Sequence, residues 1–172
     1  MKRFKTHRNE NIKSKLDRLR FNLFPAIRGT GVWVSFISEY WNEIHVRLPL
    51  SWRTRNYVGT IFGGSIYASV DPFYMLQFMK LLGKKYIVWD KSAEVFFKRP
   101  IDKTVYAKFI ITDKMVEDVK NEVAKNNKMN IDIQVDFVDK SGVIYAEIVK
   151  TIYIADKNYY KSKRNEISTI SS

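Results

Sequence analysis

Cysteine is missing from this chain of 172 residues, and histidine occurs only twice, as His7 and His45. Without cysteine the protein can form neither a disulfide framework nor a cysteine-based zinc or redox site. Two histidines are too few for a histidine-rich metal centre. We therefore expect no bound metal ion and no resident cofactor.

Long uncharged segments are also scarce. Residues 62–82 come closest to one, with Asp71 and Lys80 as their two charges. The segment is long enough to cross a bilayer, but Asp71, Pro72 and Gln77 would be costly in hydrocarbon. The basic start of the chain is not followed by the apolar run of a signal peptide. The sequence thus predicts a cytoplasmic protein with no membrane span.

Acidic residues are outnumbered, because 18 Asp and Glu face 30 Lys and Arg, which gives a net charge of +12. Such a balance favours anionic partners. The basic residues gather towards the two ends, however, and no zinc-finger or RNA-recognition signature accompanies them. We expect no nucleic-acid partner, and we interpret residues 1–10 and 158–172 as polar, basic extensions in solvent.

Hydrophobic residues make up 45% of the chain, which is enough for the core of one domain over residues 1–172, with its folded part at about 20–156. Residues 63–82 would carry apolar side chains on every face of a helix, a pattern typical of a buried helix. A helix of about 20 residues is roughly 30 Å long, the width of a small domain. The rest of the chain is expected to enclose it.

An amphipathic helix is predicted from Asn11 to a point just before Pro25, because the residue before a proline disfavours helical backbone. Its apolar residues recur at helical spacing among lysines and arginines: Ile12, Leu16, Leu19 and Leu23. This helix either covers an edge or face of the core or attaches to an acidic lipid surface.

Six segments alternate apolar and polar residues as strands do: 32–37, 43–48, 86–99, 105–111, 129–137 and 143–154. A short helix capped by Asp113 is expected between the fourth and the fifth. Strands with one apolar face favour an antiparallel sheet that is covered on one side. The expected class is α+β, with an antiparallel sheet wrapped around a long central helix.

Asp71 is the first candidate for chemistry. A carboxylate in a buried helix is costly unless it is paired, hydrogen-bonded or functional. It could act as a general base or a nucleophile. Pro72 removes a helical hydrogen bond at this point and predicts a kink. The alternative is that Asp71 bonds to local backbone at the kink and has no chemical role.

Several residues around this helix form a spaced motif. Asn56 is followed by Gly59 and then by the pair Gly63-Gly64, and Asp71 comes seven positions after the second glycine of the pair. With residues 87–93, Ile-Val-Trp-Asp-Lys-Ser-Ala, the motif resembles the hotdog-fold thioesterases of the phenylacetic-acid-pathway type. The likeness is greatest to an uncharacterised thioesterase-like subfamily and covers about residues 20–156. Phe62 stands where the family usually has histidine.

The resemblance implies hydrolysis of an acyl-CoA or acyl-carrier-protein thioester, with Asp71 as base or nucleophile. Backbone N–H groups at the helix start, near Gly63 and Gly64, would stabilise the oxyanion. The substrate would be bound by Asn56, Gly59, Phe62, Gly63 and Lys91. Coenzyme A would enter only as part of the substrate, and the resemblance implies a homodimer or dimer of dimers with sites at the subunit interface.

Phe62 also supports an alternative. With phenylalanine in place of the usual histidine, and with an aromatic-rich central helix, the chain could bind an acyl-CoA or fatty-acyl ligand without turning it over. Catalysis and binding alone are therefore two hypotheses from the sequence, and a third is a protein that interacts with nucleic acid or an acidic membrane through its basic ends.

Overall fold

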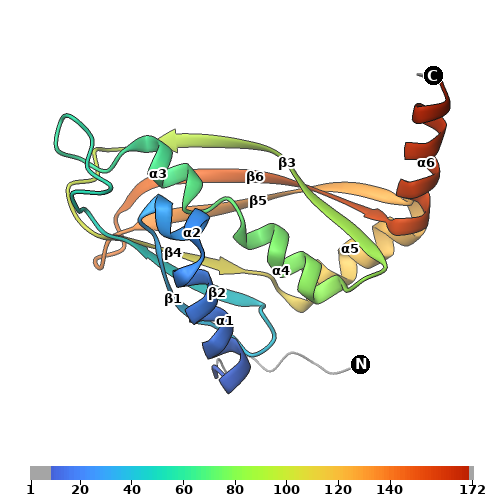
Figure 1. Ribbon diagram of the computed structural model, residues 1–172, viewed down its shortest axis with the longest axis horizontal. Coiled ribbons are helices and arrows are strands. Elements are labelled where there is room, and N and C mark those ends of the chain that lie inside the picture. The colour runs from blue at the N-terminus through green and yellow to red at the C-terminus, as the bar shows by residue number, and fades with distance from the viewer. Residues whose placement is uncertain (1–8, 171–172) are drawn as a thin grey trace.

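Six strands and six helices make up the part of the chain that the structure describes, residues 9–170 of a computed structural model (Figure 1). The strands are β1 (Trp33–Ile37), β2 (Glu43–Leu48), β3 (Tyr86–Phe97), β4 (Val105–Ile110), β5 (Lys128–Val138) and β6 (Ile144–Asp156). The helices are α1 (Ile12–Leu23), α2 (Pro25–Thr30), α3 (Gly63–Ala68), α4 (Phe73–Leu82), α5 (Asp113–Asn126) and α6 (Lys157–Ile170).

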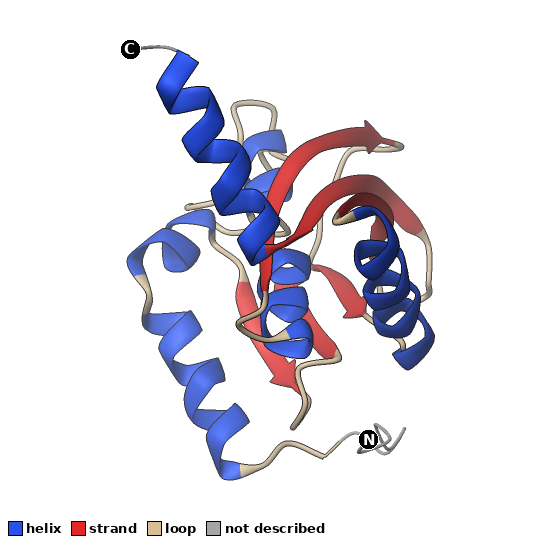
Figure 2. Ribbon diagram, turned by 90° about the vertical axis from the view of Figure 1, so that its right-hand side faces the viewer, coloured by secondary structure: helices blue, strands red, loops and turns tan. Residues whose placement is uncertain are grey.

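The strands form one antiparallel sheet in the order β1-β2-β4-β5-β6-β3. Figures 1 and 2 show this sheet curving around α4. Phe73 and Phe78 of α4 are fully buried, and the ring of Phe73 lies 4.8 Å from that of Phe109 on β4. The predicted α+β architecture, a sheet wrapped around a central helix, is confirmed.

The central helix is interrupted, in contrast to the continuous helix expected over residues 63–82. It forms α3 and α4, with a turn between Ala68 and Phe73. Pro72 has no N–H to continue the helical ladder, which explains the break. The carbonyl of Asp71 instead accepts a hydrogen bond of 2.9 Å from Nζ of Lys150 on β6. In place of the kink predicted from Pro72, the helix thus ends and a second helix begins.

Helix α1 covers the outer edge of the sheet at β1. The side chain of Asn22 accepts from the Val34 N–H at 2.8 Å and donates to the Val34 carbonyl at 2.9 Å. Glu10 accepts from the Ile37 N–H at 3.1 Å. Side chains therefore provide hydrogen-bond partners for backbone groups of β1 at this edge of the sheet. At the opposite edge, no other strand of the described chain lies beyond β3.

The C-terminal extension differs from the expected solvent tail, because residues 157–170 form α6. Asp156 begins this helix by accepting from the N–H groups of Asn158 and Tyr159 at 2.8 and 3.1 Å. Figures 1 and 2 show α6 projecting from the body of the protein. The expected tail at 171–172 and most of the extension at 1–10 lie outside the described residues. A smaller correction concerns α5, whose cap is Thr112 and not Asp113.

Candidate functional site

Asp71 lies in the turn between α3 and α4, and its side chain is 48% exposed. Its Oδ1 atom is 3.0 Å from Nζ of Lys150 and accepts a 3.1 Å hydrogen bond from the Tyr67 hydroxyl. These contacts, with the bond from Lys150 to the Asp71 carbonyl, fix the carboxylate relative to the sheet. Burial raises the pKa of Tyr67, and the charge of Asp71 raises it further. The hydroxyl therefore keeps its proton and remains a hydrogen-bond donor.

Lys150 is the centre of a cluster of polar side chains that also contains Tyr67, Asp71 and Asp90. Its side chain has no exposed surface, and its Nζ is also 3.1 Å from Oδ2 of Asp90 on β3. A lysine is almost never fully buried unless it is paired. Here one ammonium group bridges two carboxylates and lies 5.6 Å from the centre of the Tyr67 ring. The cluster therefore joins the central helix to β6 and β3.

Asp90 is the second carboxylate that Lys150 contacts. Burial raises its pKa above the ordinary value, Lys150 works against that rise, and the nearby charge of Asp71 adds to it. Its Oδ1 atom is buried and has no hydrogen-bond partner among the described residues. Two carboxylates thus share one cation, and Asp90 is easier to protonate than an aspartate in water because its pKa is raised.

Sequence reasoning selected Asp71 but missed Lys150 and Asp90. A signal for Lys150 was present, because it lies two residues from both Ile148 and Ile152 and therefore shares the core face of β6 with them. A lysine at a core position needs a buried partner of opposite charge. No comparable pattern marks Asp90, which lies within the segment 87–93.

The predicted Lys91 lies directly beside this cluster in the sequence but turns to solvent. The pairing of β3 with β6 shifts between Asp90 and Ser92, so Lys91 is the extra residue of a β-bulge. It is exposed. Its expected role in substrate binding stays a prediction.

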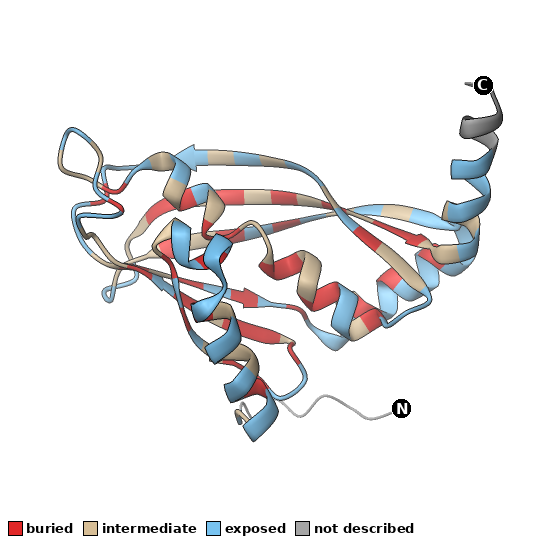
Figure 3. Ribbon diagram, viewed as in Figure 1, coloured by how far each residue is buried: buried red, intermediate tan, exposed pale blue. Residues whose placement is uncertain are grey.

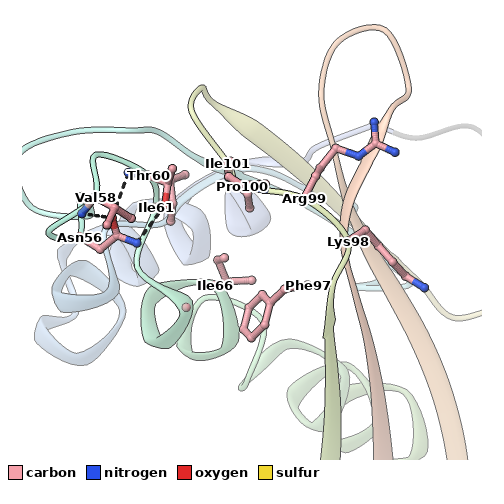
Figure 4. Close-up of a pocket in the computed structure, with 11 residues that line it drawn as sticks. Asn56, Val58, Thr60, Ile61, Ile66, Phe97, Lys98, Arg99, Pro100 and Ile101 are labelled. Atoms are coloured by element: carbon pink, nitrogen blue, oxygen red, sulfur yellow. Dashed lines mark hydrogen bonds between the residues drawn. The ribbon is translucent and has the colours of Figure 1, made fainter.

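A cavity of about 730 Å³ lies at the start of α3, and we call it the glycine cavity (Figure 4). It is bounded by the loop before α3, by α3 itself and by the end of β3. Its lining residues are Asn56, Val58, Thr60, Ile61, Gly63, Ile66, Phe97, Lys98, Arg99, Pro100 and Ile101. The lining is mostly apolar, with two cationic residues at one side.

Of the predicted binding residues, Asn56 and Gly63 line the glycine cavity. The side-chain oxygen Oδ1 of Asn56 accepts from the N–H groups of Val58 and Thr60, and its side-chain amide nitrogen Nδ2 donates to the Thr60 hydroxyl at 2.9 Å. Asn56 therefore shapes the loop as well as the wall. Gly59 lies in that loop with φ +88°, a conformation that favours glycine.

Gly63 allows a close approach, since a Cβ atom placed on it would lie 3.1 Å from the ring of Phe97. At Gly64 a Cβ atom would lie 2.3 Å from the ring of Phe62. Residue Phe62 is 57% exposed, so its ring lies between Gly64 and solvent. The Phe62 side chain therefore covers the second glycine of the pair.

Asp71 faces a different cavity, which we call the Asp71 cavity. It measures about 370 Å³ and is lined by Phe24, Ala26, Ile27, Thr30, Tyr67, Ala68, Asp71 and Pro72. It shares no lining residue with the glycine cavity in the described part of the chain. Asp71 and Gly63 therefore line two different cavities.

Two further findings bound the chemistry. Among residues 9–170, no cluster of three or more His, Asp or Glu side chains could hold a metal ion. None of the helices in the described residues is long and apolar enough to cross a membrane.

One known protein family matches most of the chain. The family described as domain of unknown function (DUF4442) matches residues 16–154. No curated protein matches the sequence.

Solved structures extend this comparison. The Pseudomonas aeruginosa protein PA5026, named as a probable thioesterase, has a TM-score of 0.71 at 13% identity over 83% of this chain and 95% of its own. The thioesterase HI1161 of Haemophilus influenzae has a TM-score of 0.58 at 16% identity over 87% of this chain and 94% of its own. The likeness shows the fold, and the predicted hotdog fold is confirmed.

Proposed function

The chain belongs to the DUF4442 family and has the fold of hotdog thioesterases, and from this premise we propose that it hydrolyses an acyl thioester with Asp71 as the general base or nucleophile. The observation that carries the proposal is the placement of Asp71. Its carboxylate is fixed by Lys150, is partly exposed, and lines a cavity at a break in the central helix.

The contacts of Asp71 suit a base. Lys150 and Tyr67 both bind Oδ1, so among the described contacts Oδ2 is the oxygen left for a water molecule or a substrate. Oδ2 would take a proton from water as the water oxygen attacks the thioester carbonyl. The resulting oxyanion would collapse and the C–S bond would break, and the thiolate would take the proton back from Oδ2 and leave as a thiol. As a nucleophile, Asp71 would attack the thioester carbonyl and expel the thiolate, which forms a mixed anhydride that water then hydrolyses to the acid and free Asp71.

The oxyanion site of this proposal is the start of α3. The first N–H groups of a helix lack partners within the helix, and Gly63 and Gly64 add little bulk there. One such donor is worth about 3–4 kcal/mol in measured hydrolases. Lys98 and Arg99 stand at the side of the glycine cavity, where they would meet coenzyme A phosphates, with Lys91 a further candidate. An acyl-carrier protein would present the same phosphate chemistry.

A second subunit would bring the two halves of the site together. Strand β3 has twelve residues and forms the unpaired edge of the sheet in the described chain. Trp89, Phe96 and Phe97 on it are 54%, 46% and 59% exposed. A long apolar edge strand is a template for pairing with another copy. We therefore propose a homodimer through β3, or a dimer of such dimers, in which Asp71 of one subunit acts at the glycine cavity of the other.

The spacing of Asn56, Gly59, Gly63, Gly64 and Asp71 supports the phenylacetic-acid-pathway subtype as the finer assignment. A cytoplasmic location belongs to the same proposal.

The second candidate is a protein that binds an acyl-CoA or fatty-acyl ligand without turnover. The specific observation in its favour is the ring of Phe62, which lies against Gly64. Thioesterases of the phenylacetic-acid-pathway type, which the sequence resembles, usually have histidine in place of Phe62. If that ring stays in place when ligand binds, it would limit access to the oxyanion site.

Hydrolysis of a panel of aliphatic and aromatic acyl-CoAs separates the two candidates. Wild type should release free thiol, and Asp71→Asn should lower kcat by about 10²–10⁴-fold. Asp118→Asn, on the exposed face of α5, is the matched control and should leave kcat unchanged. Absence of turnover for every acyl-CoA, together with binding seen by calorimetry, would select the binding protein.

A further inference from the structure

Helix α1 is oriented in an unexpected way, with its apolar residues turned to solvent. Ile12, Leu16, Leu19 and Leu23 are 81%, 49%, 53% and 60% exposed. They recur at i, i+4, i+7 and i+11, so they form one narrow row, which we call the apolar stripe of α1. Figure 3 shows exposed residues along this helix.

The inner side of α1 is occupied mainly by polar groups. Ser14 and Asn22 are buried, and Asn22 makes the two hydrogen bonds to Val34 that close the sheet edge. Phe21 is the apolar contact on this side, with its ring 5.6 Å from Trp41. Because rotation of the helix would break the bonds of Asn22, the stripe is held outward.

Cations flank the stripe on both sides. Lys13 and Arg20 lie next to it on one side of the helix and Lys15 on the other, and all three are exposed. The one acid of α1, Asp17, has a side chain only 14% exposed and faces Arg20. The outer face of α1 is thus apolar along its middle and positive along its margins.

We propose that α1 binds the surface of a membrane that contains anionic lipid. A helix with an apolar row and basic margins lies in the plane of the bilayer interface, its row among the acyl chains and its cations at the head groups. Each basic residue near such a surface adds to the attraction. The sequence before the described residues adds Lys2, Arg3, Lys5 and Arg8 to the same end of the chain.

Charge argues against a second copy of this chain as the occupant. Two copies meeting stripe to stripe about a two-fold axis would place Lys13, Lys15 and Arg20 near their own equivalents, which is unfavourable. The unpaired strand edge at β3, where we place self-association, is at the other end of the sheet from β1 and its cover α1. An acidic protein would satisfy the charges, but the stripe is an exposed row on a helix and not a groove, a shape that suits a deformable surface.

Phe24 continues the exposed surface at the end of α1 and also lines the Asp71 cavity. Membrane binding would therefore bring the mouth of that cavity near the lipid. The proposal itself does not depend on thioester hydrolysis, since it concerns a different surface and a different measurement.

The test is co-sedimentation of the full chain with vesicles of phosphatidylcholine alone and of phosphatidylcholine with phosphatidylserine. We expect binding to the anionic vesicles, little binding to the neutral ones, and weakening by salt. The variant Leu16→Gln/Leu19→Gln should lower the partition coefficient about tenfold or more, because two apolar side chains are lost from the interface.

Two controls make the result specific. Lys13→Gln/Lys15→Gln should weaken binding, whereas Lys120→Gln/Lys125→Gln, on exposed positions of α5 with the same loss of charge, should not. Sedimentation velocity of Leu16→Gln/Leu19→Gln without vesicles should match wild type.

Three outcomes would overturn the proposal. Failure of the full chain to bind anionic vesicles at physiological salt would remove the membrane as partner, and an acidic protein would then be the occupant to seek. Binding that Leu16→Gln/Leu19→Gln leaves unchanged would assign it to basic residues alone. A lower oligomeric state in that variant would show that another copy covers the stripe.

Discussion

Lys150 and Asp71 are 79 positions apart in the sequence, yet the ammonium group of one lies 3.0 Å from the carboxylate of the other. The lysine has no exposed side-chain surface, whereas the carboxylate is about half exposed. A cation supplied from the sheet therefore holds an acid at the break of the central helix. This relationship connects the stability of the fold with the proposed chemistry.

Replacing Lys150 should destabilise the protein. Lys150→Met leaves Asp71 and Asp90 close together without their shared cation, and breaking a buried ion pair costs about 3–5 kcal/mol. We expect about 3 kcal/mol of lost unfolding free energy, at the lower end because Asp71 is half exposed. Urea unfolding followed by circular dichroism measures it. As the matched control, Lys98→Met breaks an exposed pair with Glu147 and should cost less than about 1 kcal/mol. Equal losses in the two variants would contradict the central role of Lys150.

Asp90 predicts a pH dependence of stability. Because its pKa is raised in the folded protein, the folded state binds its proton more tightly than the unfolded state does. Its contribution to stability is therefore greatest below the ordinary pKa of an aspartate and is lost as pH rises through the raised value. The unfolding free energy of wild type minus that of Asp90→Asn should fall over this range. A difference that rises with pH would mean that Lys150 outweighs burial at Asp90.

Asn22 should be important for the closed sheet edge. Asn22→Ala leaves the buried N–H and carbonyl of Val34 without their partners, and each unsatisfied group costs about 1–3 kcal/mol. We expect a loss of about 2–3 kcal/mol in urea unfolding. Asn121→Ala, at an exposed position of α5, is the control and should change stability by less than about 0.5 kcal/mol. If both variants unfold alike, side-chain cover of β1 contributes nothing.

The unpaired edge at β3 predicts the oligomeric state. Wild type should sediment as a dimer or as a dimer of dimers, and Phe96→Lys should shift it towards smaller species because a charge on an edge strand opposes pairing. Ile110→Lys adds the same charge to β4, where the side chain is 42% exposed, and should leave the sedimentation coefficient unchanged. A monomeric wild type would argue against the proposed shared site.

Elements with local signals could be predicted from the sequence. The start of α1 follows from Asn11 and Ser14, which cap each other, and its end from the approach of Pro25. The alternation of apolar and polar residues in β5 and β6 indicated which face of each strand packs against the core. Lys150 could have been found as a break in that alternation, because it is a lysine at a core position.

Other features depend on contacts that a local pattern does not contain. The sequence places Asp71 and the glycine pair near each other, but in the structure Gly63 and Asp71 line two different cavities. The outward turn of the apolar stripe of α1 is set by Asn22 and its bond to β1, so helical periodicity gave the helix but not which side faces the core. The cap of α6 was readable at Asp156, yet the composition after it suggested only a solvated tail.

The central claim is that Asp71 of one subunit hydrolyses a thioester held at the glycine cavity of another. Subunit complementation tests it most directly. Asp71→Asn and Gly63→Val, a variant that fills the cavity against Phe97, should each be inactive towards acyl-CoA. After equal amounts are unfolded and refolded together, about half of the dimers are mixed, and each mixed dimer has one intact site.

We predict that thioester hydrolysis in this mixture returns to about one quarter of the wild-type rate. Separately refolded samples that are combined afterwards, before subunits exchange, should stay inactive. A refolded mixture that remains inactive while containing mixed dimers would contradict a site shared between subunits.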